Sequence, residues 1–118
     1  MIKYQATVTE IGPLTSEFID NDVMVLFGQG APEELVEFSV IHDGQELAGE
    51  ISPGDTVCFD DDCFTILAVG EVANTNLKNL GHLVFKFNSS TEPEMPGDVC
   101  VEKKPIPPVT VGMKIYIK

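Results

Sequence analysis

Residues 38–51 of the chain read Phe38-Ser39-Val40-Ile41-His42-Asp43-Gly44-Gln45-Glu46-Leu47-Ala48-Gly49-Glu50-Ile51. Three of the first four residues are aromatic or β-branched, which favours a strand. The Asp43-Gly44 pair that follows is a strong hairpin-turn signal, because glycine tolerates a positive φ. The stretch therefore predicts a hairpin-like unit with His42 at a strand end, where the backbone is held and the imidazole stays accessible.

Short strand patterns separated by turn residues continue on both sides of this unit. The predicted strands cover residues 2–11, 23–27, 38–41, 56–59, 63–69, 82–87, 99–101 and 113–117. A single helical turn is predicted at residues 31–35, and one short helix at residues 71–80 that Gly81 would end. We therefore expect an all-β fold, a small closed or nearly closed β-barrel of about six to eight short strands with one short helix.

The core of this barrel is expected to come from apolar residues of its strands. The predicted core residues are Val23, Val25, Phe27, Phe64, Ile66, Leu83, Phe85 and Phe87. In residues 82–87 the alternation is clear, because every second residue is Leu or Phe and the opposite face carries His82 and Lys86. Closure into a barrel is favoured, since it leaves no exposed strand edge.

Length and cysteine content predict a single domain that needs no disulfide and keeps its cysteine thiols reduced. A chain of 118 residues buries about two-thirds of its unfolded surface without cross-links. Cys58, Cys63 and Cys100 are odd in number and fit no metal-ligand spacing, so we expect reduced thiols in a soluble cytoplasmic protein. The alternative is a Cys58–Cys63 bridge across the three aspartates at 60–62. The start of the chain does not resemble a signal peptide, and no apolar run is long enough to span a bilayer.

Charge excludes two classes of partner. The net charge is −12, from 19 acidic and 7 basic residues, and all of the basic residues are lysines. Binding to nucleic acid or to an anionic membrane surface is therefore not expected. The acidity either keeps the protein in solution or complements a basic partner.

Two histidines, His42 and His82, are the side chains that titrate near neutrality without help. No nucleophile motif or phosphate loop is present, and residues 60–62 lack the glycine and terminal glutamate of a calcium loop. We therefore expect no cofactor and no metal. Two alternatives remain open: a metal site formed by His42, His82 and a carboxylate, and a non-catalytic acidic β-barrel that acts as a binding or regulatory module.

Several segments together carry a family resemblance. They are Phe27-Gly28-Gln29-Gly30-Ala31-Pro32 with Glu33-Glu34-Leu35, Ile41-His42 with Gly44 and Glu46-Leu47, Ala68-Val69-Gly70, and Asn76-Leu77 with Leu80-Gly81-His82. In order and spacing they resemble the glucitol/sorbitol-specific IIA component of the bacterial phosphoenolpyruvate-dependent sugar phosphotransferase system, nearly end to end. One departure is that Asp43-Gly44 directly follows the histidine, where the best-known members have Cys-His-Gly.

The resemblance implies a single phosphotransferase IIA domain over residues 1–118, with a compact β-barrel fold. It implies that His42 is the phosphohistidine nucleophile, which takes a phosphoryl group from phosphorylated HPr and passes it to the IIB component in sugar-alcohol uptake. The implied partners are HPr and the IIB and IIC components, with the membrane reached only through the transporter. Because the chain has no arginine, His82 is a candidate donor to the phosphoryl oxygens.

Overall fold

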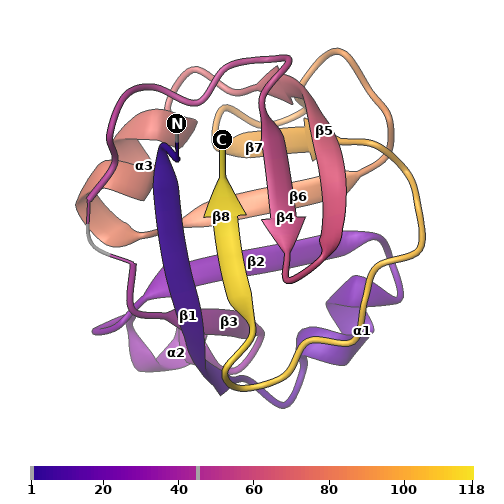
Figure 1. Ribbon diagram of the computed structural model, residues 1–118. Coiled ribbons are helices and arrows are strands. Elements are labelled where there is room, and N and C mark those ends of the chain that lie inside the picture. Colours follow the sequence, from indigo (N-terminus) through magenta and orange to yellow (C-terminus); the bar gives the residue numbers. More distant parts are fainter. Residues whose placement is uncertain (1, 45) are drawn as a thin grey trace.

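Eight strands pair in a closed ring in the computed structural model, which describes residues 2–44 and 46–118 (Figure 1). The strands are β1 (Tyr4–Ile11), β2 (Val23–Gly28), β3 (Ser39–His42), β4 (Thr56–Phe59), β5 (Asp62–Val69), β6 (Leu83–Phe87), β7 (Asp98–Val101) and β8 (Lys114–Ile117). Around the ring their order is β1-β3-β2-β6-β7-β5-β4-β8, and β8 closes against β1. The pairs β2–β3 and β6–β7 are parallel, and the other pairs are antiparallel. The predicted closed β-barrel is confirmed.

Three short helices accompany the described strands, where the sequence predicted one helix and one helical turn. They are α1 (Thr15–Ile19), α2 (Glu33–Val36) and α3 (Ala73–Leu80). The helix α3 ends as predicted at Gly81, which has a left-handed φ of 65°. The helix α1 was missed because a helix this short depends on packing. It lies against β2, and its Phe18 ring stacks on Phe38 at 5.0 Å.

Aromatic rings fill the inside of the barrel. The rings of Phe59, Phe64, Phe85 and Phe87 meet with centroids 5.1 to 6.3 Å apart. All four side chains are buried within one hydrophobic cluster, to which every strand contributes. The predicted core residues of β5 and β6, which include three of these rings, are confirmed.

The predicted core face of β2 is wrong. Met24 and Leu26 belong to the central cluster, whereas Val25 and Phe27 are buried on the outer side and Val23 is half-buried. The reason is that residues 23–27 are a continuous apolar run, which contains no alternation from which to choose a face. The outer side of β2 is apolar because α1 covers part of it.

The predicted second strand of the hairpin after His42 does not form. Both edges of β3 are already used, since it pairs antiparallel with β1 and parallel with β2. The described residues between β3 and β4 form no strand and run past α3 and over one end of the barrel (Figure 1). Gln45, within the predicted hairpin, lies outside the described residues. Hydrogen bonds hold this segment, from Ala48 N–H to Lys3 O at 2.7 Å and in both directions between Ile51 and Asn74.

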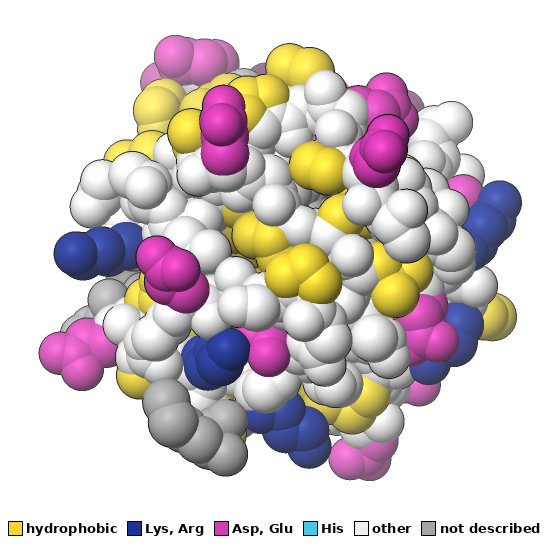
Figure 2. Space-filling view, turned by 90° about the horizontal axis from the view of Figure 1, so that it is seen from above, with side chains coloured by type: hydrophobic (Ala, Val, Ile, Leu, Met, Phe, Trp, Pro, Cys, Tyr) yellow, Lys and Arg dark blue, Asp and Glu magenta, His cyan; other side chains and the backbone are white. Residues whose placement is uncertain are grey.

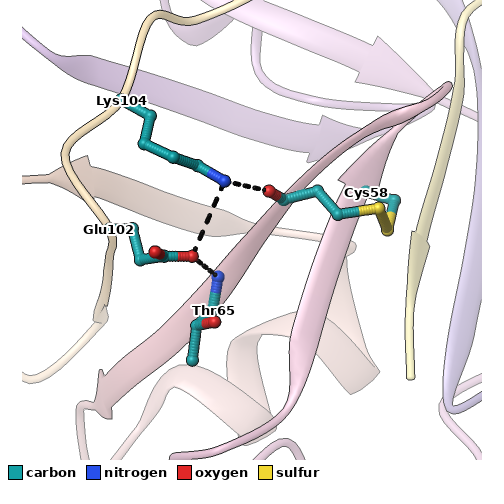
Figure 3. Close-up of a disulfide and its surroundings, with 5 residues drawn as sticks. Cys58, Thr65, Glu102 and Lys104 are labelled. Carbon is teal, nitrogen blue, oxygen red and sulfur yellow. Dashed lines mark hydrogen bonds and ion pairs between the residues drawn. A yellow bond between two sulfur atoms is a disulfide. The ribbon is translucent and has the colours of Figure 1, made fainter.

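The expectation of three reduced thiols is wrong for two of them. Cys58 and Cys63 form a disulfide, with Cα atoms 4.0 Å apart, whereas Cys100 is free and buried (Figure 3). A two-residue turn joins β4 to β5, so the register sets the two cysteines directly opposite each other. Beside them, the Lys104 ammonium donates to Cys63 O at 2.6 Å, which ties the chain after β7 to this hairpin (Figure 3).

Acidic side chains are spread over much of the surface. Figure 2, a view onto one end of the barrel, shows hydrophobic side chains near the centre with Asp and Glu around them and lysines at several places. Among the described residues we find no helix with the length and hydropathy needed to cross a bilayer.

Candidate active site

His42 is the last residue of β3 and lies at an end of the barrel interior. It is opposite Val8 of β1 and Gly28 of β2, and alternation with the core residue Val40 turns its ring inward. Its exposed fraction is 0%. The expectation of an accessible imidazole is therefore wrong for this arrangement, because the barrel wall and the connection after α3 enclose the strand end.

Backbone groups hold both ring nitrogens of His42. The Gly44 N–H donates to Nδ1 at 3.0 Å, and Nε2 lies 2.7 Å from Gly81 O. Because an amide N–H can only donate, Nδ1 is the unprotonated nitrogen. The neutral ring then carries its proton on Nε2 and donates it to Gly81 O. Either nitrogen must lose a backbone contact before it can bond another group.

The lack of a side chain at Gly28 and at Gly81 allows the Gly81 carbonyl to lie this close to the imidazole of His42. A Cβ on Gly81 would lie 2.9 Å from Cε1 of His42 and 2.9 Å from Cα of Gly28. A Cβ on Gly28 would lie 2.7 Å from Leu80 O. The end of β2 and the cap of α3 therefore touch through bare backbone, which brings the Gly81 carbonyl to the imidazole.

The surroundings keep His42 neutral. Burial lowers its pKa below the ordinary value of 6.5, and the bond to Gly81 and the charge of Asp43 only partly oppose this. The Tyr4 ring meets the imidazole edge-on with centroids 5.9 Å apart. Burial, followed by Asp43, raises the pKa of Tyr4 to about 12, so this phenol adds no charge. A neutral imidazole is the form that can act as a nucleophile at pH 7.

Asp43 does not contact the imidazole as a catalytic partner. Its carboxylate accepts a hydrogen bond from Thr7 N–H at 2.7 Å, and its own N–H donates to Thr7 O at 3.2 Å. These bonds continue the β1–β3 pairing by one residue. The sequence argument that neighbouring strand residues point apart therefore holds for this pair.

A hollow of about 330 Å³ borders His42. Three segments line it, residues 27–30 at the end of β2, residues 42–44, and residues 77–81 at the end of α3. Leu80 on its wall is 50% exposed. A larger hollow, of about 870 Å³ along β1 and β8, includes Asp43 but neither histidine. Of these two hollows, only the smaller one joins a histidine to solvent-exposed side chains.

His82 belongs to different surroundings. It is half-buried, and its Nδ1 lies 3.1 Å from Leu26 O, so Nδ1 carries a proton and donates it. Its ring packs on Phe27 with centroids 4.6 Å apart, on the outer side of β2. His82 is not among the residues that line the hollow beside His42. The two predicted site residues are thus not brought into one pocket.

The described residues contain no group of three or more His, Cys, Asp or Glu side chains arranged to hold a metal ion. The alternative metal site built from both histidines and a carboxylate is therefore not supported by the geometry. The site residues that sequence reasoning missed are Gly28, Gly44 and Gly81, which act through backbone atoms or through the lack of a side chain. In the sequence all three glycines fall within the segments that carry the family resemblance, and Gly44 and Gly81 also mark a turn and a helix stop, but none of these signals indicated contact with His42.

Comparison with known proteins gives a consistent result. Residues 3–116 match the family model described as the PTS system glucitol/sorbitol-specific IIA component. The glucitol/sorbitol-specific EIIA components of Shigella flexneri and Escherichia coli (strain K12) are each 37% identical over 98 residues, which is 83% of this chain and 80% of theirs. The crystal structure of a PTS system IIA component from Enterococcus faecalis V583 superposes with a TM-score of 0.80 at 28% identity, covering 94% of this chain and 96% of that one. The chain belongs to the family of glucitol/sorbitol-specific IIA components of the phosphotransferase system.

Proposed function

We propose that His42 accepts a phosphoryl group from phosphorylated HPr and passes it to the IIB component during glucitol or sorbitol uptake. The whole chain, residues 1–118, acts as a single IIA domain. HPr and the IIB component are its direct partners, and IIC is its link to the membrane, which implies a cytoplasmic location. The single observation that carries the proposal is a histidine held neutral beside a hollow, in a chain of this family.

The transfer is balanced without an added base. A ring nitrogen of neutral His42 gives its lone pair to phosphorus, while the bond from phosphorus to the donor histidine nitrogen breaks and that nitrogen keeps the electron pair. The proton on the other ring nitrogen of His42 stays in place. In this arrangement that proton is on Nε2, and the Nε2–H group donates a hydrogen bond to Gly81 O. Phosphoryl transfer of this kind depends mainly on positioning and on stabilising charge at the phosphoryl oxygens.

Access is part of the mechanism. Because His42 is 0% exposed and both nitrogens have backbone partners, one contact opens before the donor phosphoryl group reaches the ring. His82 remains a proposed donor to the phosphoryl oxygens. With Nδ1–H given to Leu26 O, only Nε2 is left for this role, and it can donate only from a protonated ring.

The test is incubation with phosphoenolpyruvate, the general phosphotransferase enzyme and HPr, followed by intact-mass measurement. The wild-type protein should gain one phosphoryl group that is lost in acid. His42→Gln should gain none while keeping a β-rich circular dichroism spectrum. Glutamine is preferred to alanine because the buried ring would leave a cavity. A wild-type protein that takes no phosphoryl group would instead favour a non-catalytic binding module, and a fully phosphorylated His42→Gln would move the site elsewhere.

A further inference from the structure

Lys78 lies in the last turn of α3 and lines the same hollow as His42. It is the one basic residue among those that line this hollow, and its side chain is exposed. The acidic residue Asp43, which follows His42 in the chain, also lines this hollow. A phosphoryl group on His42 would therefore form next to an acidic residue, in a chain of net charge −12.

The other lysines are already engaged. They are Lys3 with Asp55 at 2.7 Å, Lys86 with Asp98 at 3.2 Å, Lys103 with Asp22 at 3.8 Å, Lys104 with Glu102 at 3.7 Å, Lys114 with Thr7 Oγ1 at 2.8 Å, and Lys118 above the Tyr116 ring at 5.6 Å. Of the seven lysines, Lys78 alone has no such partner in the described part of the chain. The chain has no arginine. The cation without a partner is thus the one beside His42.

We propose that Lys78 Nζ contacts the phosphoryl oxygens during transfer to and from His42 and is a catalytic residue of this reaction. The inference rests on the proposed function. A lysine ammonium is a compact point charge on a flexible stem, so it can follow the phosphoryl group as the group moves between donor and acceptor nitrogens. Charge stabilisation at these oxygens is the main work left to the protein once the reacting groups are aligned.

A lysine in this position also complements the dipole of α3. A role confined to the dipole would change stability and leave the transfer rate alone. A role confined to attracting a partner would change the concentration of HPr needed for half-maximal rate, but not the rate at saturation. The experiment must separate these two roles from contact with the phosphoryl group.

The test compares Lys78→Gln, Lys78→Arg and the control Lys103→Gln, which removes another exposed lysine. Single-turnover transfer from phosphorylated HPr is followed by quenched flow at saturating HPr. We expect Lys78→Gln to slow transfer at least about tenfold, Lys78→Arg to stay within about threefold and Lys103→Gln within about twofold. In ³¹P NMR titrations of the phosphorylated proteins, Lys78→Gln should raise the pKa of the phosphoryl group, because a nearby cation favours its dianion.

Three outcomes would overturn the inference. They are a saturated rate for Lys78→Gln within about twofold of wild type, a loss that appears only in the half-saturating HPr concentration, or an equal loss in Lys103→Gln. Failure of the proposed function looks different, since the wild-type protein itself would then take no phosphoryl group on His42. A wild-type protein that is phosphorylated on His42, beside a Lys78→Gln variant of unchanged rate, would reject only the role of Lys78.

Discussion

His42 is both the candidate nucleophile and a buried titratable group, so it should couple the stability of the fold to pH. Its pKa is lowered in the folded state by burial, relative to the ordinary value of 6.5 in the unfolded chain. The unfolded state therefore binds the proton more readily. The contribution of neutral His42 to the free energy of unfolding is present above pH 6.5 and is lost as the pH falls below it.

We expect the stability difference between wild type and His42→Gln to shrink between about pH 7.5 and about pH 5.5. Urea unfolding of both proteins at the two pH values measures it. Comparison with the variant removes the effects of the many carboxylates, which both proteins share. A difference that is the same at both pH values would contradict a buried neutral His42.

His82→Ala is predicted to slow transfer from phosphorylated HPr by at least about tenfold, the loss of one charge-stabilising donor. Since Nδ1–H is bonded to Leu26 O, the donor would be Nε2 of the protonated ring. Quenched-flow measurement of single-turnover transfer from phosphorylated HPr to His82→Ala and to wild type tests this. A rate within about twofold of wild type would remove His82 from the site.

For a single residue, the sequence shows whether its side chain can react better than it shows how that side chain is buried and bonded. His42 could be chosen because few side chains titrate near neutrality and the family resemblance points to it. Its full burial could not be predicted, because the enclosing groups come from Tyr4, Gly28 and Gly81, which are distant in the sequence. The contacts of its nitrogens are with backbone atoms, for which residue type gives little signal.

The cap of α3 is the element that sets the geometry of the imidazole. Gly81→Ala would introduce a side chain at a φ of +65° and 2.9 Å from Cε1 of His42. Gly112→Ala is a matched control, because its φ is +95° and a Cβ there meets nothing within 4 Å. Both should lose about 1 kcal/mol or more from backbone strain.

Only Gly81→Ala should also slow the phosphorylation of His42, because it alone displaces the ring or the Gly81 carbonyl. Urea unfolding and transfer from phosphorylated HPr measure the two effects separately. If both variants lost equal stability and kept equal transfer rates, the close contact between Gly81 and His42 would have no part in the reaction.

The β4–β5 hairpin is expected to depend on its disulfide for stability but not for activity. The bridge spans a sequence separation of five residues, and a loop of that size corresponds to about 2 kcal/mol of stabilisation through the unfolded state. Reductant should lower the free energy of unfolding of wild type by this amount and leave Cys58→Ala/Cys63→Ala unchanged. Phosphorylation should be unaffected, since neither strand lines the hollow. Equal sensitivity of both proteins to reductant would contradict this.

Elements were predictable where a regular pattern was present. In β6 large apolar residues occupy every second position, so the face that enters the core was predicted correctly. In β2 all residues from 23 to 27 are apolar, so the sequence could not indicate which face enters the core. The hairpin β4–β5 follows from its two-residue turn. The hairpin expected after His42 fails because β1 and β2, from elsewhere in the chain, already occupy both edges of β3.

For the whole molecule, strand number and closure were predictable but the order of the strands was not. Turn spacing and alternation indicate a small barrel, and they carry no information on which strands meet. The two parallel pairs, β2–β3 and β6–β7, require connections that return from the end of one strand to the start of the next, at the opposite end of the pair. In the first pair α2 lies on that connection, which is why residues 31–35 looked like an isolated helical turn in the sequence.

The pairing of β1 with β8 joins Tyr4 to Ile117 and Gln5 to Tyr116, which are almost the whole chain apart. Such a contact carries a large loop-closure cost before it contributes any stability, and proteins rich in distant pairings fold on the slow scale of milliseconds to seconds. During synthesis, β1 cannot pair with β8 until the residues of β8 have left the ribosome. Until then β1 and β4 each lack one neighbour, and these open edges are where a nascent chain of this barrel is most exposed to pairing with another.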